Sequence, residues 1–278
     1  MLTQSPDTAP SSHDRDGPCE IIRGDQSCAL LLICDHASNA LPPGYGTLGL
    51  PSTEFHRHIA YDIGAAEVTR RLARHFGASA VLGKYSRLLI DLNRGQDDPT
   101  LVMKLSDGAI IPANREADPF RDAQEFQRRV EHYYLPYHRA IAGELSAIRA
   151  RGEVPVIVSV HSFTPSWRGK MRPWHAAVLW DRDDRLARVL FGEFEKEGGL
   201  TVGDNQPYPG YLRGDTLYQH GTVHGFAHAL IEIRQDLIAR EEGQAEWAAR
   251  LQRYLEAALA HGDMHEIRHF GSRTDRRT

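Results

Sequence analysis

The segment ALLLICDHASN, residues 29–39, decides the fold class of this 278-residue chain. Residues 29–34 form a continuous apolar run that is too short for a helix and is typical of a central strand buried on both faces of a sheet. The run opens directly into polar residues that begin with Asp35 and His36. Because ligands of open α/β sheets bind beyond the carboxyl ends of the strands, we expect the chemistry of the protein to follow this segment.

Around this strand, short apolar runs alternate with longer amphipathic ones, as in a sheet covered by helices. Further strands are expected at residues 80–83, 88–92, 154–160, 176–180 and 227–233. Helices are expected at residues 63–76, 122–150, 186–197 and 245–260, the second of them as one helix or as two broken at Pro136. The sequence therefore predicts an α/β fold.

Composition narrows the class of protein. The chain has 33 Lys+Arg against 37 Asp+Glu and a net charge of −4, so it lacks the basic excess that duplex nucleic acid selects. Its length and 41% hydrophobic content suffice for a large core in one domain, which we place at residues 19–268. Residues 1–18 and 269–278 are expected to be flexible polar tails. The expected partner is a small metabolite.

The cysteine pattern and the hydropathy of the chain indicate the cellular compartment of the protein. Cys19, Cys28 and Cys34 are an odd set without a CxxC pair, which favours reducing conditions. The longest apolar run is far shorter than the ~20 residues that cross a bilayer, and the N-terminus lacks a signal-peptide apolar region. We expect a cytoplasmic protein without membrane contact. The oligomeric state stays open, and a homo-oligomer is compatible with the sequence.

Two histidines, His36 and His161, each follow or end a predicted strand. They are candidate metal ligands, because catalytic zinc usually takes three protein ligands and keeps a fourth position for water. The third ligand would be Asp62 or Asn39. An anionic carboxylate binds Zn²⁺ more strongly than an amide, which favours Asp62, although Asp62 could equally cap the helix that follows it. Asp35 could orient an imidazole from outside the coordination sphere.

Glu232 lies inside the apolar strand predicted at residues 227–233. Burying an ionised carboxylate without a partner costs several kcal/mol, so Glu232 needs a cation, a metal or a proton. One interpretation is a structural pair with Arg234, which shares its strand face. The other is a general base that takes a proton from metal-activated water.

Residues 85–94, YSRLLIDLNR, hold a second dense group of polar side chains. Arg87, Asp91 and Asn93 would share one face of the strand predicted there, and Arg94 would begin the loop. A guanidinium can bind a carboxylate through two hydrogen bonds or polarise a carbonyl. We expect an ion pair between Arg87 and Asp91, with Arg94 free for an anionic ligand.

Together these segments resemble the N-formylglutamate amidohydrolase family. The resemblance covers roughly residues 29–238 and rests on six blocks in order: ICDHASN at 33–39, YDIG at 61–64, SRLLIDLNR at 86–94, VHSFTP at 160–165, VGDNQPY at 202–208 and EIRQDL at 232–237. It implies a three-layer α/β/α hydrolase with a mixed, mostly parallel central sheet, of the phosphorylase/hydrolase-like type and similar to zinc carboxypeptidases and aspartoacylase.

The resemblance also implies a metal centre with one Zn²⁺ per chain. His36 and His161 match the two zinc-binding histidines of the family. Asn39 stands at the position of the zinc-binding glutamate, so Asp62 is expected to be the third ligand in its place.

For the reaction, Glu232 matches the base and Arg87 the arginine that stabilises the developing oxyanion. Asn93 and Arg94 match the clamp for the substrate carboxylate. The full set of expected substrate contacts is Asn93, Arg94, Arg234 and Tyr208.

We therefore expect a zinc-dependent amidohydrolase of amino-acid metabolism that cleaves the amide C–N bond of a small anionic N-acyl amino acid. N-formyl-L-glutamate, giving formate and L-glutamate, is the expected substrate. The alternatives are a carboxypeptidase or amidase acting on cell-wall-type peptides and a non-catalytic binding module. His220 and His224, before the last strand, could line the mouth of the site, donate a proton or simply belong to a loop.

Overall fold

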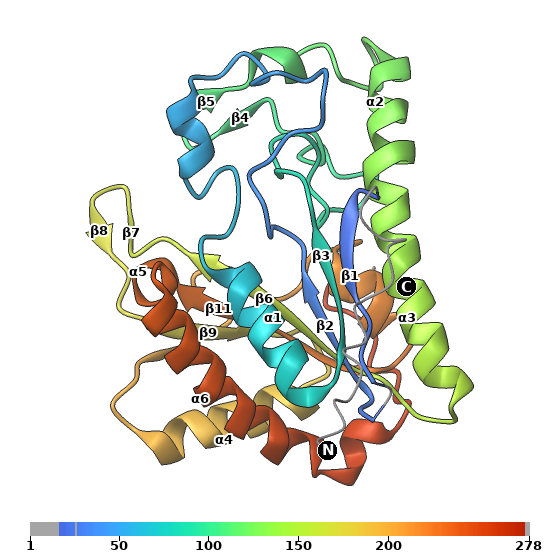
Figure 1. The fold of residues 1–278 in the computed structure, drawn as a ribbon, viewed down its shortest axis with the longest axis vertical. Coiled ribbons are helices and arrows are strands. Elements are labelled where there is room, and N and C mark those ends of the chain that lie inside the picture. Colours follow the sequence, from blue (N-terminus) through green and yellow to red (C-terminus); the bar gives the residue numbers. More distant parts are fainter. Residues whose placement is uncertain (1–16, 26, 276–278) are drawn as a thin grey trace, which may run out of the picture.

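The computed structural model describes residues 17–25 and 27–275, and its centre is a seven-stranded sheet with the strand order β1-β3-β2-β6-β11-β9-β10 (Figure 1). In that order the strands are Cys19–Ile22, Ser79–Gly83, Leu30–Cys34, Val156–Phe163, Ala227–Arg234, Ala176–Leu179 and Val202–Asp204. The β1–β3 and β11–β9 pairs are antiparallel, and all other neighbours in this sheet are parallel. The predicted mixed, mostly parallel sheet is confirmed.

Helices cover both faces of the sheet, which makes the three layers expected (Figure 1). Alternate residues of β2 face opposite layers, because Leu30 and Leu32 pack with one apolar cluster while Leu31 and Ile33 pack with the other. The first cluster includes side chains from α1 (Ala65–Phe76), α4 (Arg185–Glu197) and α6 (Glu241–Leu259). The second includes side chains from α3 (Leu135–Ala150).

The helical segment predicted at 122–150 is not uniform. It comprises α2 (Ala123–Arg129), a π-helical turn η3 (Val130–Tyr134) and then α3. Pro136 lies in the first turn of α3, directly after the π-helical turn, and its ring nitrogen has no N–H to donate. The expected break near Pro136 is therefore a change of helical type.

The prediction of a strand at residues 88–92 is wrong. The segment is buried, as its apolar character suggested, but it runs through turns, and its backbone groups bond to loops and side chains. Asp91 N donates to Leu101 O, and Arg129 donates to the carbonyl of Leu89. Burial alone does not specify a strand when other groups satisfy the backbone.

Short elements that the sequence did not reveal complete the fold. They are β1, β10, the hairpins β4–β5 (Leu105–Ser106, Ala109–Ile110) and β7–β8 (Ser166–Trp167, Lys170–Met171), the helix α5 (Gln235–Ile238), the 3₁₀ helices η1 (Ser52–His56), η2 (Pro112–Asn114) and η5 (Gly262–His265), and the π-helical turn η4 (Tyr218–Thr222). The β7–β8 hairpin directly follows β6.

Most of the two predicted tails, residues 1–16 and 276–278, lies outside the described residues. Within 269–275, Ser272 is buried and Arg273 N donates to Asp181 Oδ1 over 3.0 Å. Among the helices that the structure describes, none has both the length and the apolar character needed to cross a bilayer.

Candidate active site

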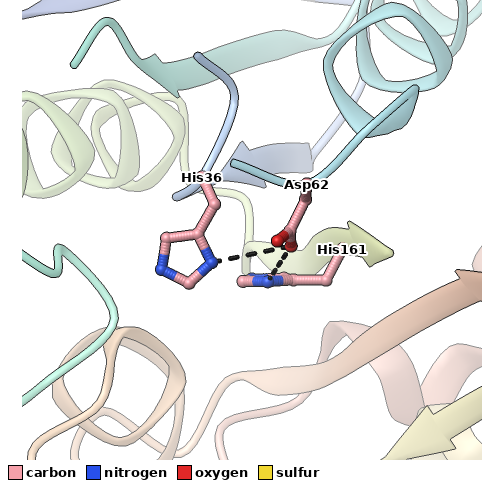
Figure 2. A group of neighbouring side chains, drawn as sticks. All are labelled: His36, Asp62 and His161. Atoms are coloured by element: carbon pink, nitrogen blue, oxygen red, sulfur yellow. Dashed lines mark ion pairs between the residues drawn. The ribbon is translucent and has the colours of Figure 1, made fainter. Parts of the chain in front are cut away.

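Three side chains from separate parts of the chain converge near the carboxyl ends of β2 and β6 (Figure 2). His36 lies two residues after β2, His161 is in the last half of β6, and Asp62 precedes α1. Asp62 N donates to His36 O over 2.9 Å, which fixes one loop against the other. One ligand atom from each residue lies within 4.8 Å of the other two, and all three residues are buried.

The geometry favours Asp62 over Asn39 as the third ligand. Asp62 Oδ2 lies 2.8 Å from Nδ1 of His161 and 3.5 Å from Nδ1 of His36. Gly64, not Asp62, is the N-cap of α1, so the capping role considered for Asp62 is not observed. Asn39 donates its amide to Phe55 O over 2.8 Å instead.

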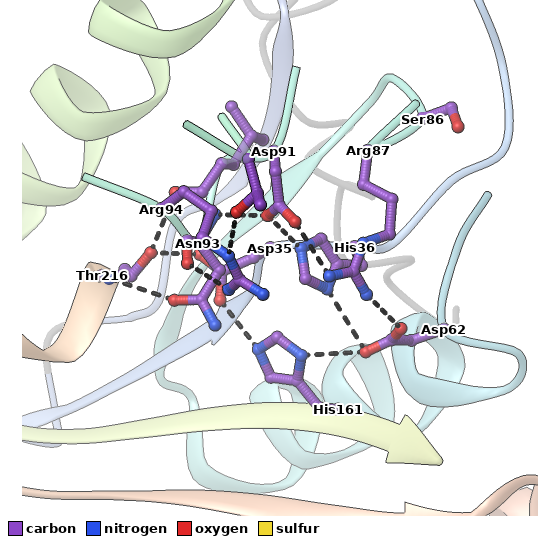
Figure 3. A network of polar contacts seen from close by, with 12 residues as sticks. Asp35, His36, Asp62, Ser86, Arg87, Asp91, Asn93, Arg94, His161 and Thr216 are labelled. Carbon is purple, nitrogen blue, oxygen red and sulfur yellow. Dashed lines mark hydrogen bonds and ion pairs between the residues drawn. The ribbon is translucent and has the colours of Figure 1, made fainter. Parts of the chain in front are cut away.

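Each histidine of this group forms a hydrogen bond through Nε2 to a carboxylate other than that of Asp62 (Figure 3). Nε2 of His161 donates to Asp35 over 2.9 Å, and Nε2 of His36 donates to Asp91 over 2.7 Å. In metal centres, a carboxylate bound to one ring nitrogen orients the imidazole so that the other nitrogen, once deprotonated, can bind the ion. Asp35 thus orients an imidazole, as predicted from the sequence, but it is that of His161 and not of its neighbour His36.

These carboxylates are anionic. Burial alone would raise the pKa of Asp35, but the hydrogen bond and charge of His161 hold it below its usual range. The histidines do the same for Asp62, and the charge of Arg87 lowers the pKa of Asp91 against its burial. Three anionic carboxylates around two imidazoles suit a bound cation.

Glu232 faces this group from the neighbouring strand. It is in register with His161 across the parallel β6–β11 pair, so both side chains lie on the same face of the sheet. Its carboxyl is buried, and Oε2 has no hydrogen-bond partner among the described residues. Burial raises the pKa of Glu232 to about 7, with the charge of His161 opposing the shift. The structural pair with Arg234 does not form, because Arg234 binds Asp236 over 2.7 Å.

Arg87 lies close to two carboxylates, those of Asp91 and Asp62. Its Nη2 lies 2.8 Å from Asp91 Oδ2, so the predicted ion pair is confirmed, although it spans a turn and not a strand. Its Nη1 lies 3.7 Å from Asp62 Oδ1. Nε of Arg87 is buried and has no hydrogen-bond partner in the described part of the chain.

The residues expected to contact the substrate differ in the bonds that they already form within the protein. Asn93 Oδ1 accepts from Thr216 N over 3.0 Å (Figure 3). Arg94 donates to Asn93 O and to Thr100 and has no carboxylate within 4.0 Å among the described residues. Arg234 is engaged by Asp236 and Trp174 O, so its predicted substrate contact would require this arrangement to open.

Tyr208 is joined to an arginine that the sequence did not single out. Its hydroxyl accepts from Arg172 Nη2 over 3.0 Å. The phenol is near enough to Glu232 and Arg87 to interact with both charges: beyond the effect of burial, Glu232 raises the pKa of Tyr208 and Arg87 lowers it. Tyr208 and Arg172 therefore border the same site.

His220 and His224 lie elsewhere. They line a cavity of about 540 Å³ with Arg149 and Phe226, and no member of the His36, Asp62 and His161 group lines it. His220 Nε2 is 3.0 Å from Nδ1 of His138, and both histidines are buried. This placement does not support the expectation that His220 and His224 line the mouth of the site.

Thr216 and Tyr137 had no signal in the local sequence for their roles, and Asp91 was expected to pair with Arg87 but not with His36. Thr216 and Tyr137 both donate to Asp35 Oδ1, from residues 181 and 102 positions away. Only the fold shows that the carboxylate of Asp35 is held on all sides.

We expect Asp35→Asn to weaken zinc binding about 10–100-fold, because a neutral amide polarises the imidazole of His161 less than a carboxylate does. Competition with a chromophoric chelator measures the dissociation constant. The matched control is Asp184→Asn, which changes a carboxylate at the N-cap of α4 that pairs with Arg188. Equal zinc affinity in the two variants would show that Asp35 does not act through His161.

Comparison with known proteins shows which proteins this chain resembles. A model of the N-formylglutamate amidohydrolase family matches residues 28–239. N-formylglutamate deformylase of Pseudomonas putida is 32% identical over 119 residues, 41% of this chain and 41% of that protein. The Pseudomonas aeruginosa protein of the same name is 28% identical over 145 residues, 48% of this chain and 51% of that protein. The chain thus spans about half, or less, of the length of these curated relatives.

Two solved structures extend the comparison to the fold. The gene product Atu2144 from Agrobacterium tumefaciens is 34% identical, with a TM-score of 0.81 over 88% of this chain and 95% of that one. N-formylglutamate amidohydrolase from Ralstonia eutropha JMP134 is 20% identical, with a TM-score of 0.64 over 87% of this chain and 97% of that one. The second likeness is one of fold.

Proposed function

The chain belongs to the N-formylglutamate amidohydrolase family, and from this premise we propose that it is a zinc-dependent hydrolase that cleaves the amide C–N bond of N-formyl-L-glutamate. The observation that carries the proposal is the buried group of His36, Asp62 and His161 with Glu232 beside it, whose Oε2 has no hydrogen-bond partner among the described residues. The names of the two curated relatives support the choice of substrate.

The donor set fits one zinc ion. His36, Asp62 and His161 would hold it through two imidazole nitrogens and a carboxylate oxygen, the number of protein ligands typical of catalytic zinc. His36 Nδ1 is buried without a hydrogen-bond partner among the described residues, as expected for an atom that binds a metal. When bound, the ion supplies a Lewis acid that polarises the amide carbonyl and makes water acidic near neutral pH.

The residues of the chain would move the protons. Glu232 would accept a proton from the attacking water, whose oxygen bonds to the formyl carbon. Glu232 would then deliver that proton to the amide nitrogen as the C–N bond breaks, giving formate and glutamate. Because the carboxyl is buried with a pKa near neutrality, it suits both acceptance and return of the proton.

Arginines would bind the charges of the substrate. Arg87, oriented by Asp91, would donate to the formyl oxygen as negative charge develops on it. Arg94 would pair with the α-carboxylate together with the amide of Asn93, since Arg94 lacks a carboxylate partner in the described structure.

The test is a panel of N-acyl amino acids with release of free amine measured. We expect N-formyl-L-glutamate to be hydrolysed fastest, activity to disappear on chelation, and one equivalent of Zn²⁺ per chain to restore it. Turnover that survives complete removal of metal would contradict the mechanism. Faster hydrolysis of cell-wall-type peptides than of any N-formyl amino acid would contradict the substrate.

A further inference from the structure

Arg172 is a buried cation without a counterion in the described part of the chain. Three arginines are buried there: Arg129, Arg172 and Arg185. Arg129 pairs with Glu125 over 2.7 Å and Arg185 with Asp183 over 2.6 Å. No carboxylate among the described residues lies within 4.0 Å of the Arg172 guanidinium. A buried charge without a partner is unfavourable, so this position calls for an anion.

The surroundings of Arg172 hold its guanidinium without neutralising it. Nη1 donates to Thr164 O and Oγ1, and Nη2 donates to the Tyr208 hydroxyl, all of them neutral acceptors. The guanidinium also lies 5.6 Å from the ring centroid of Phe163, 5.8 Å from that of Trp167 and 5.2 Å from that of Tyr208. Aromatic faces attract a cation but leave its charge available to a ligand.

The fold places this guanidinium beside the proposed reaction centre. Arg172 directly follows the β7–β8 hairpin, which extends from the end of β6 (Figure 1). Its backbone N–H donates to Pro165 O over 2.8 Å and closes the hairpin base. Phe163, under the guanidinium, is two residues after His161 and so shares its face of the strand. On the other side, the hydroxyl of Tyr208 accepts from Arg172 Nη2 over 3.0 Å.

Arg94 is a second arginine without a carboxylate partner among the described residues. Of the described arginines that are not exposed, Arg94 and Arg172 are the two without a carboxylate within 4.0 Å. Arg87 and Arg234 are both paired with aspartates. A ligand that satisfies both unpaired arginines carries two negative groups. N-formylglutamate has two, the α-carboxylate and the side-chain carboxylate.

We propose that Arg172 is an anion subsite that binds the side-chain carboxylate of the substrate and so selects dicarboxylic N-acyl amino acids. The inference rests on the proposed function, in which Arg94 takes the α-carboxylate. Tyr208 positions the guanidinium from its Nη2 side, and Thr164 does so from Nη1. The arginine fork can then present its donors to a planar carboxylate.

The experiment compares N-formyl-L-glutamate with N-formyl-L-glutamine, a neutral substrate of nearly the same shape. In the unsubstituted protein we expect kcat/KM to be at least ~10²-fold higher for the glutamate compound. Arg172→Gln should bring this ratio close to one, through a higher KM for the glutamate compound and little change for the glutamine compound. Arg172→Lys, which keeps the charge, should retain part of the preference.

The matched control is Arg94→Gln, which should lower kcat/KM for both compounds alike because both have an α-carboxylate. A purely structural Arg172 would also affect both compounds alike. Equal rates in the unsubstituted protein, or a preference that survives in Arg172→Gln, would overturn the subsite and leave the proposed function standing.

Binding of glutarate separates the two proposals if neither compound is hydrolysed, in which case the proposed function fails. The rise in melting temperature with glutarate, compared with butyrate, measures the subsite without turnover. A rise specific to glutarate that Arg172→Gln abolishes supports the subsite. The same response to both acids, or in both proteins, contradicts it.

Discussion

Glu232→Gln is expected to lower kcat by ~10²–10⁴ while the zinc content stays at that of the unsubstituted protein. Glutamine has nearly the shape of glutamate but cannot accept a proton. Glu232 is beside the metal-binding group and is not one of its three members, so metal binding should survive the change. Steady-state kinetics with N-formyl-L-glutamate and metal analysis of the same preparation give both readouts.

The control for this variant is Glu197→Gln, a glutamate of α4 that pairs with Arg250 and Arg253 at the surface. It should leave kcat unchanged. Full turnover in Glu232→Gln would remove Glu232 as the base. Loss of zinc together with turnover would instead make Glu232 a metal ligand, and the group of three would have to be redrawn.

Arg87→Ala is expected to lower kcat by ~10²–10³ with a much smaller change in KM. The charge on the formyl oxygen develops mainly in the transition state, so a donor aimed at it stabilises the transition state more than the bound substrate. Nε of Arg87, buried without a hydrogen-bond partner among the described residues, agrees with a guanidinium kept available for the reaction.

Arg70→Ala is the matched control, since Arg70 forms an ion pair of similar geometry with Glu20, at 2.6 Å, on the far edge of the sheet. Zinc affinity must be measured alongside, because Asp91 links Arg87 to His36. A fall in kcat that added zinc fully reverses would show that Arg87 acts only by holding the metal ligands in place. A change confined to KM would make it a ground-state contact.

Continuous apolar runs were sufficient to predict the central strands. β2, β6 and β11 are buried along nearly their whole length, as parallel strands covered on both faces must be, and their sequences show this directly. The same signal was misleading at residues 88–92, which are equally apolar and equally buried but satisfy their backbone through Leu101 O and Arg129. β1 and β10 were missed because short edge strands have little apolar pattern.

The sequence by itself determined the α/β class and singled out three residues of the candidate site, His36, His161 and Glu232, because each lies in or just after a buried strand where polar groups stand out. Only the tertiary structure placed Asp62, and not Asn39, beside His36 and His161, and only it joined His36 to Asp91 and His161 to Asp35. These contacts span 55 and 126 residues. The first brings the segment after β3 to the end of β2, and the second depends on β2 lying beside β6, so no local pattern contains them. Whether an arginine has a counterion is likewise a property of the packed fold, and that is why Arg172 became visible only in three dimensions.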